Sequence, residues 1–155
     1  MTSDDTILVI GYGNPLREDD GVGWRVAALL QARVTLQGMA VPMEIVTCHQ
    51  LMPELAAKVS EAARVVFVDA ADAAPPGRVT MSRITATGGG LGPVAHHLGP
   101  GDLLALAQKF YQASPDAWLV AVNGASWGYG ERLSPEVEAA AHEAVACIME
   151  RLAQK

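Results

Sequence analysis

The sequence is poor in cysteine, in aromatic residues and in positive charge. Its 155 residues include only two cysteines, Cys48 and Cys147, and they lack the CxxC spacing of a zinc ribbon. Neither a disulfide framework nor a structural zinc site is therefore predicted. The 11 Lys and Arg residues are outnumbered by 17 Asp and Glu residues, which gives a net charge of −6. This charge excludes a general electrostatic attraction to nucleic acid or to an anionic membrane surface.

Long hydrophobic runs and a secretory signal are also absent from the sequence. No apolar run approaches the roughly 20 residues needed to span a bilayer, and the N-terminus is acidic where a secretory signal would be basic. We therefore expect a cytoplasmic protein with no membrane partner and no nucleic-acid partner. Because 50% of the residues are hydrophobic and 18% are charged, the composition predicts one compact domain over residues 1–155.

Short hydrophobic runs alternate with longer helical patterns along the chain. This alternation predicts an α/β fold, a three-layer α/β/α sandwich around a mixed, mainly parallel five-stranded sheet. The predicted strands are Thr6–Gly11, Met43–Cys48, Val65–Ala70, Arg78–Ile84 and Trp118–Asn123. The predicted helices run from about Asp20 to Ala32, Leu51 to Ala63, Asp102 to Gln112 and Pro135 to Leu152. Because the 71–77 connection is too short for a crossover helix, the fourth strand is predicted to run antiparallel.

Four polar features follow the parallel strands and so should share the carboxyl edge of the sheet: the 11–23 loop, residues 48–50, Asp69 and Asn123. The loop reads GYGNPLREDDGVG and contains three consecutive acids. Leu16 stands where a dinucleotide fingerprint needs its third glycine, and three acids would repel a pyrophosphate. Either Asp19 or Asp20 caps the following helix, or the surplus acid belongs to a cation site; both interpretations stay open.

Asp69 and a pair of histidines are the other candidates for chemistry. Asp69 ends an almost wholly apolar strand, so its carboxylate either has a partner or is exposed at the sheet edge. His96 and His97 follow the glycine-rich segment 88–92. An imidazole there would complete an oxygen and nitrogen metal site, provided that residues 85–97 cross back to the carboxyl edge.

Three further patterns are weaker. Ser126 lies in a literal GxSxG pattern, but the glycines that follow continue a loop instead of opening the helix that a nucleophile elbow needs. His142-Glu143 lacks the second histidine of HExxH and is typical of a solvated helix face. Cys48 and His49 are neighbours on an extended strand and point to opposite faces, which favours a structural thiol.

Taken together, the motifs resemble those of the [NiFe]-hydrogenase maturation endopeptidases over nearly the whole chain. The resemblance rests on the 11–23 loop, on Phe67-Val-Asp69-Ala and on His96-His97-Leu-Gly, with further likeness at 49–55 and 128–135. It implies a small α/β/α protease that removes the C-terminal extension of the hydrogenase large-subunit precursor after nickel insertion. The matching metal and catalytic positions are Asp20, Asp69 and His96, with His97 as the alternative to His96.

The resemblance also implies a cofactor and a partner. Nickel would be presented by the precursor, while zinc or another divalent ion is the alternative occupant of the isolated protein, which is expected to be a monomer. The segments 88–92 and 124–130 are expected to be mobile and to shape specificity. Two other classes remain: a peptidyl-tRNA hydrolase-like esterase, disfavoured by the acidic 18–20 run, and a noncatalytic metal-sensing or chaperone module.

Overall fold

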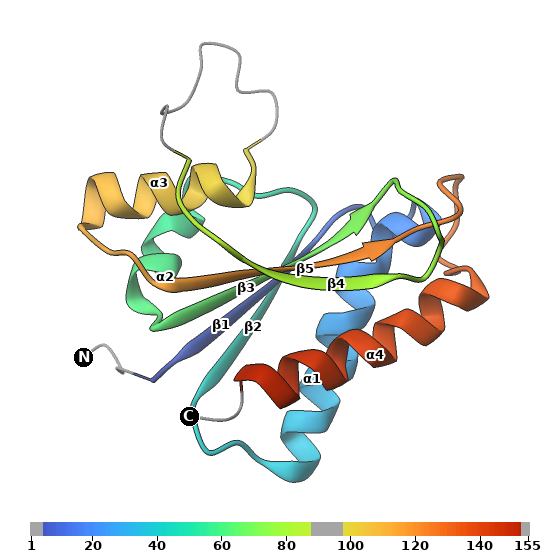
Figure 1. The fold of residues 1–155 in the computed structure, drawn as a ribbon, viewed down its shortest axis with the longest axis horizontal. Coiled ribbons are helices and arrows are strands. Elements are labelled where there is room, and N and C mark those ends of the chain that lie inside the picture. The colour runs from blue at the N-terminus through green and yellow to red at the C-terminus, as the bar shows by residue number, and fades with distance from the viewer. Residues whose placement is uncertain (1–4, 88–97, 153–155) are drawn as a thin grey trace.

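The computed structural model describes residues 5–87 and 98–152 and contains one five-stranded sheet with helices on both faces (Figure 1). The strands are β1 (Ile7–Tyr12), β2 (Met43–Cys48), β3 (Arg64–Ala71), β4 (Val79–Ile84) and β5 (Asp116–Asn123). The helices are α1 (Val22–Gln37), α2 (Leu55–Glu61), α3 (Pro100–Tyr111) and α4 (Pro135–Leu152), and a 3₁₀ turn (Glu18–Gly21) precedes α1.

The strand order is β2-β1-β3-β5-β4. The first four of these strands are parallel neighbours, whereas β4 runs antiparallel to β5, with Val79 opposite Val122 and Ile84 opposite Ala117. The predicted mixed sheet is confirmed, and so is its reason: the short link from β3 to β4 holds no helix, so β4 cannot return to run parallel.

The central strands β1 and β3 are buried on both faces, because successive residues point into different layers, whereas the edge strands β2 and β4 are only partly buried. On β3, Val66 and Val68 lie in the core beneath α1 and α4, while Val65 and Phe67 lie in the core beneath α2 and α3. Figure 1 shows these two helix pairs on opposite sides of the sheet. This arrangement explains the continuous apolar run of β3, since neither face of the strand reaches water.

Helices α1 and α2 differ from the predicted helices at both ends, whereas α3 is shifted by only one or two residues. Helix α1 begins at Val22, because Glu18–Gly21 form a separate 3₁₀ turn, and it extends to Gln37. Helix α2 is limited to Leu55–Glu61, so Pro53 lies in the turn before it, where the Pro53 carbonyl accepts a hydrogen bond from the Ala56 amide. In the described part of the chain, no helix is long and apolar enough to cross a membrane.

Candidate functional site

The carboxyl ends of β1 and β3 lie side by side in the sheet and form its topological switch point. From β1 the chain order continues to β2 on one side, while β3 lies on the other. Open α/β sheets place their ligand sites at this kind of crevice. Glycines at both ends of the 11–23 loop let the start of α1 pack directly against the end of β1. A Cβ on Gly11 would lie only 2.2 Å from the Gly23 carbonyl oxygen.

Asp69 lies near the end of β3 and is largely buried. Its Oδ2 accepts a hydrogen bond of 3.0 Å from the hydroxyl of Tyr12, the last residue of β1. Burial raises the pKa of Asp69 to about 6. Hydrogen bonds from Tyr12 and from the Ala70 amide favour the charged form and only partly offset this increase. The negative charge of Asp20 adds to the increase.

Asp20 is held at the mouth of the switch point by the backbone of its own loop. Its Oδ2 accepts a hydrogen bond of 2.8 Å from the Asn14 amide. The loop turns sharply at Gly13, where φ is 136°, a backbone conformation that glycine adopts readily. A side chain at this position would place its Cβ 2.2 Å from the Asp20 carbonyl oxygen. The indole of Trp24 donates to the Gly13 carbonyl and fixes the turn from the other side. The Asp20 carboxylate is therefore oriented before any ligand arrives.

Asp19 has a different role from both alternatives raised by the sequence. It is fully buried, and its carboxylate accepts hydrogen bonds from the amides of Ala125, Ser126 and Ser134 and from the Ser134 hydroxyl, all within 2.9 Å. Burial alone would raise the pKa of Asp19, but these bonds together lower it. Of the two interpretations left open by the sequence, the one in which Asp19 or Asp20 caps the first helix is wrong, because the cap residue of α1 is Gly21, without a side-chain hydrogen bond.

Glu18 fastens the same distant loop at a second point. One of its oxygens, Oε1, accepts hydrogen bonds of 2.7 Å from the Ser126 hydroxyl and the Gly128 amide. Glu18 itself has a left-handed backbone with φ of 52°, a conformation that a non-glycine residue keeps only when its surroundings enforce it. The loop at 124–130, which we expected to be mobile, is thus tied to the 18–20 turn.

The predicted site residues are only partly brought together by the described structure. Asp20 and Asp69 share the switch point, whereas His96 and the alternative His97 lie outside the described residues. Within residues 5–87 and 98–152, no three His, Cys, Asp or Glu side chains form a group able to hold a metal ion. The carboxylate pair is therefore described, and the imidazole stays a prediction.

The weaker candidates have structural partners. The Ser126 hydroxyl donates to Glu18. Of the two described histidines, His49 packs against Trp24 and His142 lies 3.3 Å from Glu138. Asn123 is buried and donates to the Pro75 carbonyl, which secures the link between β3 and β4. The sequence pattern gave no signal for Tyr12, whose contact with Asp69 depends on β1 and β3 being neighbours.

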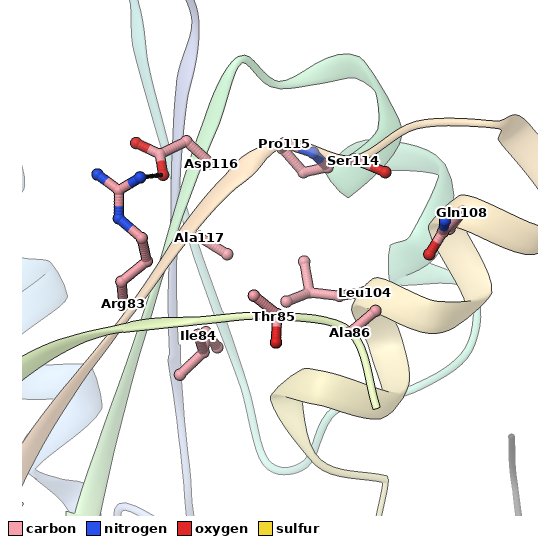
Figure 2. Close-up of a pocket in the computed structure, with 10 residues that line it drawn as sticks. All are labelled: Arg83, Ile84, Thr85, Ala86, Leu104, Gln108, Ser114, Pro115, Asp116 and Ala117. Atoms are coloured by element: carbon pink, nitrogen blue, oxygen red, sulfur yellow. Dashed lines mark ion pairs between the residues drawn. The ribbon is translucent and has the colours of Figure 1, made fainter. Parts of the chain in front are cut away.

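One cavity of the described surface lies next to the loop that carries Asp20 and another lies at the opposite edge of the sheet, and neither is lined by Asp20 or Asp69. A groove of about 570 Å³ runs beside the site between the 13–21 loop and the start of α4, lined by Pro15, Trp24 and Leu133 among others. Figure 2 shows the second cavity, about 600 Å³, where the end of β4 diverges from the start of β5. An ion pair of 3.1 Å joins Arg83 and Asp116 there, at the opposite edge of the sheet from Asp20 and Asp69.

Solved structures share this architecture. The hydrogenase maturating endopeptidase HybD from E. coli is 26% identical, with a TM-score of 0.74 over 95% of this chain and 91% of its own. The hydrogenase 2 maturation peptidase from a Thaumarchaeota archaeon is 27% identical, with a TM-score of 0.67 over 97% of this chain and 99% of its own. The chain has the fold of the hydrogenase maturation proteases.

A further structure extends the likeness in fold. The [NiFe] hydrogenase maturation protease HycI from Thermococcus kodakarensis superposes with a TM-score of 0.74 at 24% identity, over 96% of this chain and 92% of its own. No protein-family model and no curated protein matches the sequence. The structural likeness to hydrogenase maturation proteases therefore agrees with the motif resemblance and covers almost the whole length of both compared chains.

Proposed function

We propose that this protein is an endopeptidase that removes the C-terminal extension of a [NiFe]-hydrogenase large-subunit precursor after nickel insertion. The observation that carries the proposal is the Asp20 and Asp69 carboxylate pair at the switch point of a fold shared with hydrogenase maturation proteases. The substrate and the reaction follow from that similarity. The charge and composition of the chain agree with a cytoplasmic protein substrate in place of a nucleic acid or a membrane.

In this proposal Asp20 and Asp69 bind the nickel that the precursor carries, with His96 as the third ligand. The donor set fits: two carboxylates and one imidazole leave coordination positions open, so the ion can stay on its own protein while it is recognised. Asn14 and Tyr12 each hold one carboxylate oxygen, which orients the pair toward the ion. Because two of the three ligands are hard oxygens, the isolated protein should bind zinc or nickel only weakly.

The experiment is to incubate the purified protein with nickel-loaded and nickel-free precursor and to weigh the products by mass spectrometry. We expect one cut in the nickel-loaded precursor and none in the nickel-free form. Asp20→Asn keeps the size of the side chain but removes its charge, and should lower the processing rate at least about 100-fold. The exposed Asp72→Asn is the matched control and should process normally.

Two results would overturn this function. Efficient cutting of nickel-free precursor would remove nickel from recognition, and full activity of Asp20→Asn would remove Asp20 from the site. If the wild-type protein binds the nickel-loaded precursor but never cuts it, the noncatalytic metal-sensing alternative replaces the protease.

A further inference from the structure

Tyr129 is the most conspicuous side chain that the proposed chemistry does not use. It lies in the loop between β5 and α4, and 86% of its surface is exposed. It makes no hydrogen bond to any side chain or backbone group that the structure describes, and its one described partner is the guanidinium of Arg17, 4.6 Å from the ring centroid. Folding therefore gains little from the aromatic ring at this position.

The backbone that carries Tyr129 is fixed from both sides. The Gly130 amide donates to the Leu16 carbonyl, and the Gly130 carbonyl accepts from the Glu18 amide, each at 2.8 Å. The Arg17 side chain under the ring is itself fixed, because its Nε and Nη2 donate to the Trp127 carbonyl at 3.2 and 3.0 Å. The ring is thus presented to solvent on a preorganised support.

Glu18 and Asp19 complete this support and connect it to the candidate site. Glu18 accepts from the Gly128 amide, next to Tyr129, and Asp19 holds both ends of the loop through Ala125 and Ser134. Asp20 is the next residue along the chain. The same three-acid turn that contains Asp20 therefore also holds the loop that carries the exposed ring.

An exposed aromatic residue on a fixed loop is well suited to anchor a protein partner. Tyrosine brings a large contact area, and few conformations are lost on binding when its loop is already ordered. Its surroundings match an interface with an apolar centre and a polar rim: Leu16, bonded to Gly130, is 54% exposed, and the groove beside it includes Glu131 and Arg132.

We propose that Tyr129 is a docking anchor for the folded body of the protein substrate, entering an apolar pocket that offers its hydroxyl a hydrogen-bond acceptor. This inference rests on the proposed function, since the docked protein is the precursor whose metal Asp20 and Asp69 bind. Docking at Tyr129 would place the precursor against the switch point without any contact to the bond that is cut. Tyr129 is accordingly a specificity-determining residue, and the chemistry stays with the carboxylates.

The test compares Tyr129→Ala, Tyr129→Phe and Phe110→Ala in processing of nickel-loaded precursor. Phe110 is the matched control: it is 61% exposed and has a cation, Lys109, over its ring, but it lies on α3, away from the 18–20 turn. We expect Tyr129→Ala to raise KM about tenfold while kcat stays within about twofold. Tyr129→Phe should give a smaller increase in KM, and Phe110→Ala none.

A binding measurement separates this proposal from the proposed function. In an Asp20→Asn background, which stops processing, Tyr129→Ala should still weaken capture of the precursor about tenfold relative to the parent variant, with an unchanged melting temperature. If wild-type protein processes the precursor and Tyr129→Ala leaves KM and capture unchanged, the anchor is wrong while the function stands. If Tyr129→Ala changes the sedimentation of the protein in the absence of precursor but leaves processing and capture unchanged, Tyr129 makes contacts between copies of this chain. That result would also overturn the proposal.

Discussion

Two carboxylates at the same end of the sheet, the fully buried Asp19 and the partly buried Asp69, have opposite electrostatic surroundings. Asp19 accepts four hydrogen bonds from the loop that follows β5, and its pKa is lowered. Asp69 has the Tyr12 hydroxyl and the Ala70 amide, and its pKa is raised to about 6. The first carboxylate is stabilised as an anion by the fold, and the second is destabilised as an anion.

The difference separates a structural acid from a functional one. The negative charge of Asp19 is already stabilised by hydrogen-bond donors, so binding a cation would gain little. Asp19 therefore contributes to stability and not to binding. A desolvated carboxylate beside a second negative charge gains most when a cation arrives, which is the situation of Asp69 beside Asp20. The more buried of the two carboxylates has the lowered pKa, so the number of hydrogen-bond donors, and not the degree of burial, sets the direction of each shift.

The largest effect should come from removing the charge of Asp19. In Asp19→Asn one side-chain oxygen becomes an NH₂ group that faces N–H and O–H donors, so buried donors lose their acceptor. We expect the free energy of unfolding to fall by about 3 kcal/mol, measured by urea denaturation at neutral pH. Because the pKa of Asp19 is lowered, this contribution is present above the unfolded value near 3.8 and is lost as the pH falls through the folded pKa. An unchanged denaturation midpoint would contradict the structural role.

The second effect has the opposite sign. Asp69→Asn keeps an oxygen for the Tyr12 hydroxyl but removes a desolvated charge, so the variant should be more stable than the wild type at pH 7.5 by about 1–3 kcal/mol. The folded carboxyl binds its proton more tightly than the unfolded one. The contribution of Asp69 to wild-type stability therefore falls as the pH rises from about 4 to about 6 and is constant above that window.

Thermal melts over a pH series check this prediction. The difference between Asp69→Asn and wild type should open between about pH 4 and pH 6 and disappear below about pH 4. Asp72→Asn, which changes an exposed carboxylate three residues further along, is the control variant for this series. A variant that is less stable than the wild type at pH 7.5 would mean that Asp69 is satisfied in the same way as Asp19.

The smallest effect concerns Ser126, which tests whether the 124–130 loop is support or catalyst. Ser126→Ala loses the 2.7 Å hydrogen bond to Glu18 but keeps the backbone bond to Asp19, so the loss of stability should be about 1 kcal/mol. Processing should stay within about twofold of wild type, as in the exposed control Ser114→Ala. Complete loss of activity in the folded Ser126→Ala variant would return the serine-nucleophile interpretation.

The sheet and its layers were predictable from local patterns. The apolar run at 65–68 identified a strand buried on both faces, and the short 71–77 link implied the antiparallel β4. The start of α1 was not predictable in the same way, because Glu18–Gly21 form a 3₁₀ turn whose bonds run to Gly130 and Ser126. A helix boundary set by residues more than 100 positions away leaves no periodic signal in its own segment.

The sequence by itself determined the strand and helix order, the edge at which polar residues gather, and the presence of more acids at 18–20 than a helix start needs. Only the tertiary structure decided what each acid does. Glu18 and Asp19 accept hydrogen bonds from donors 106 to 115 residues away, while Asp20 and Asp69 come to the same end of the sheet because β1 and β3 are adjacent. The physical reason is that the role of a carboxylate depends on the donors and charges around it, and those come from segments that only the folded chain brings together.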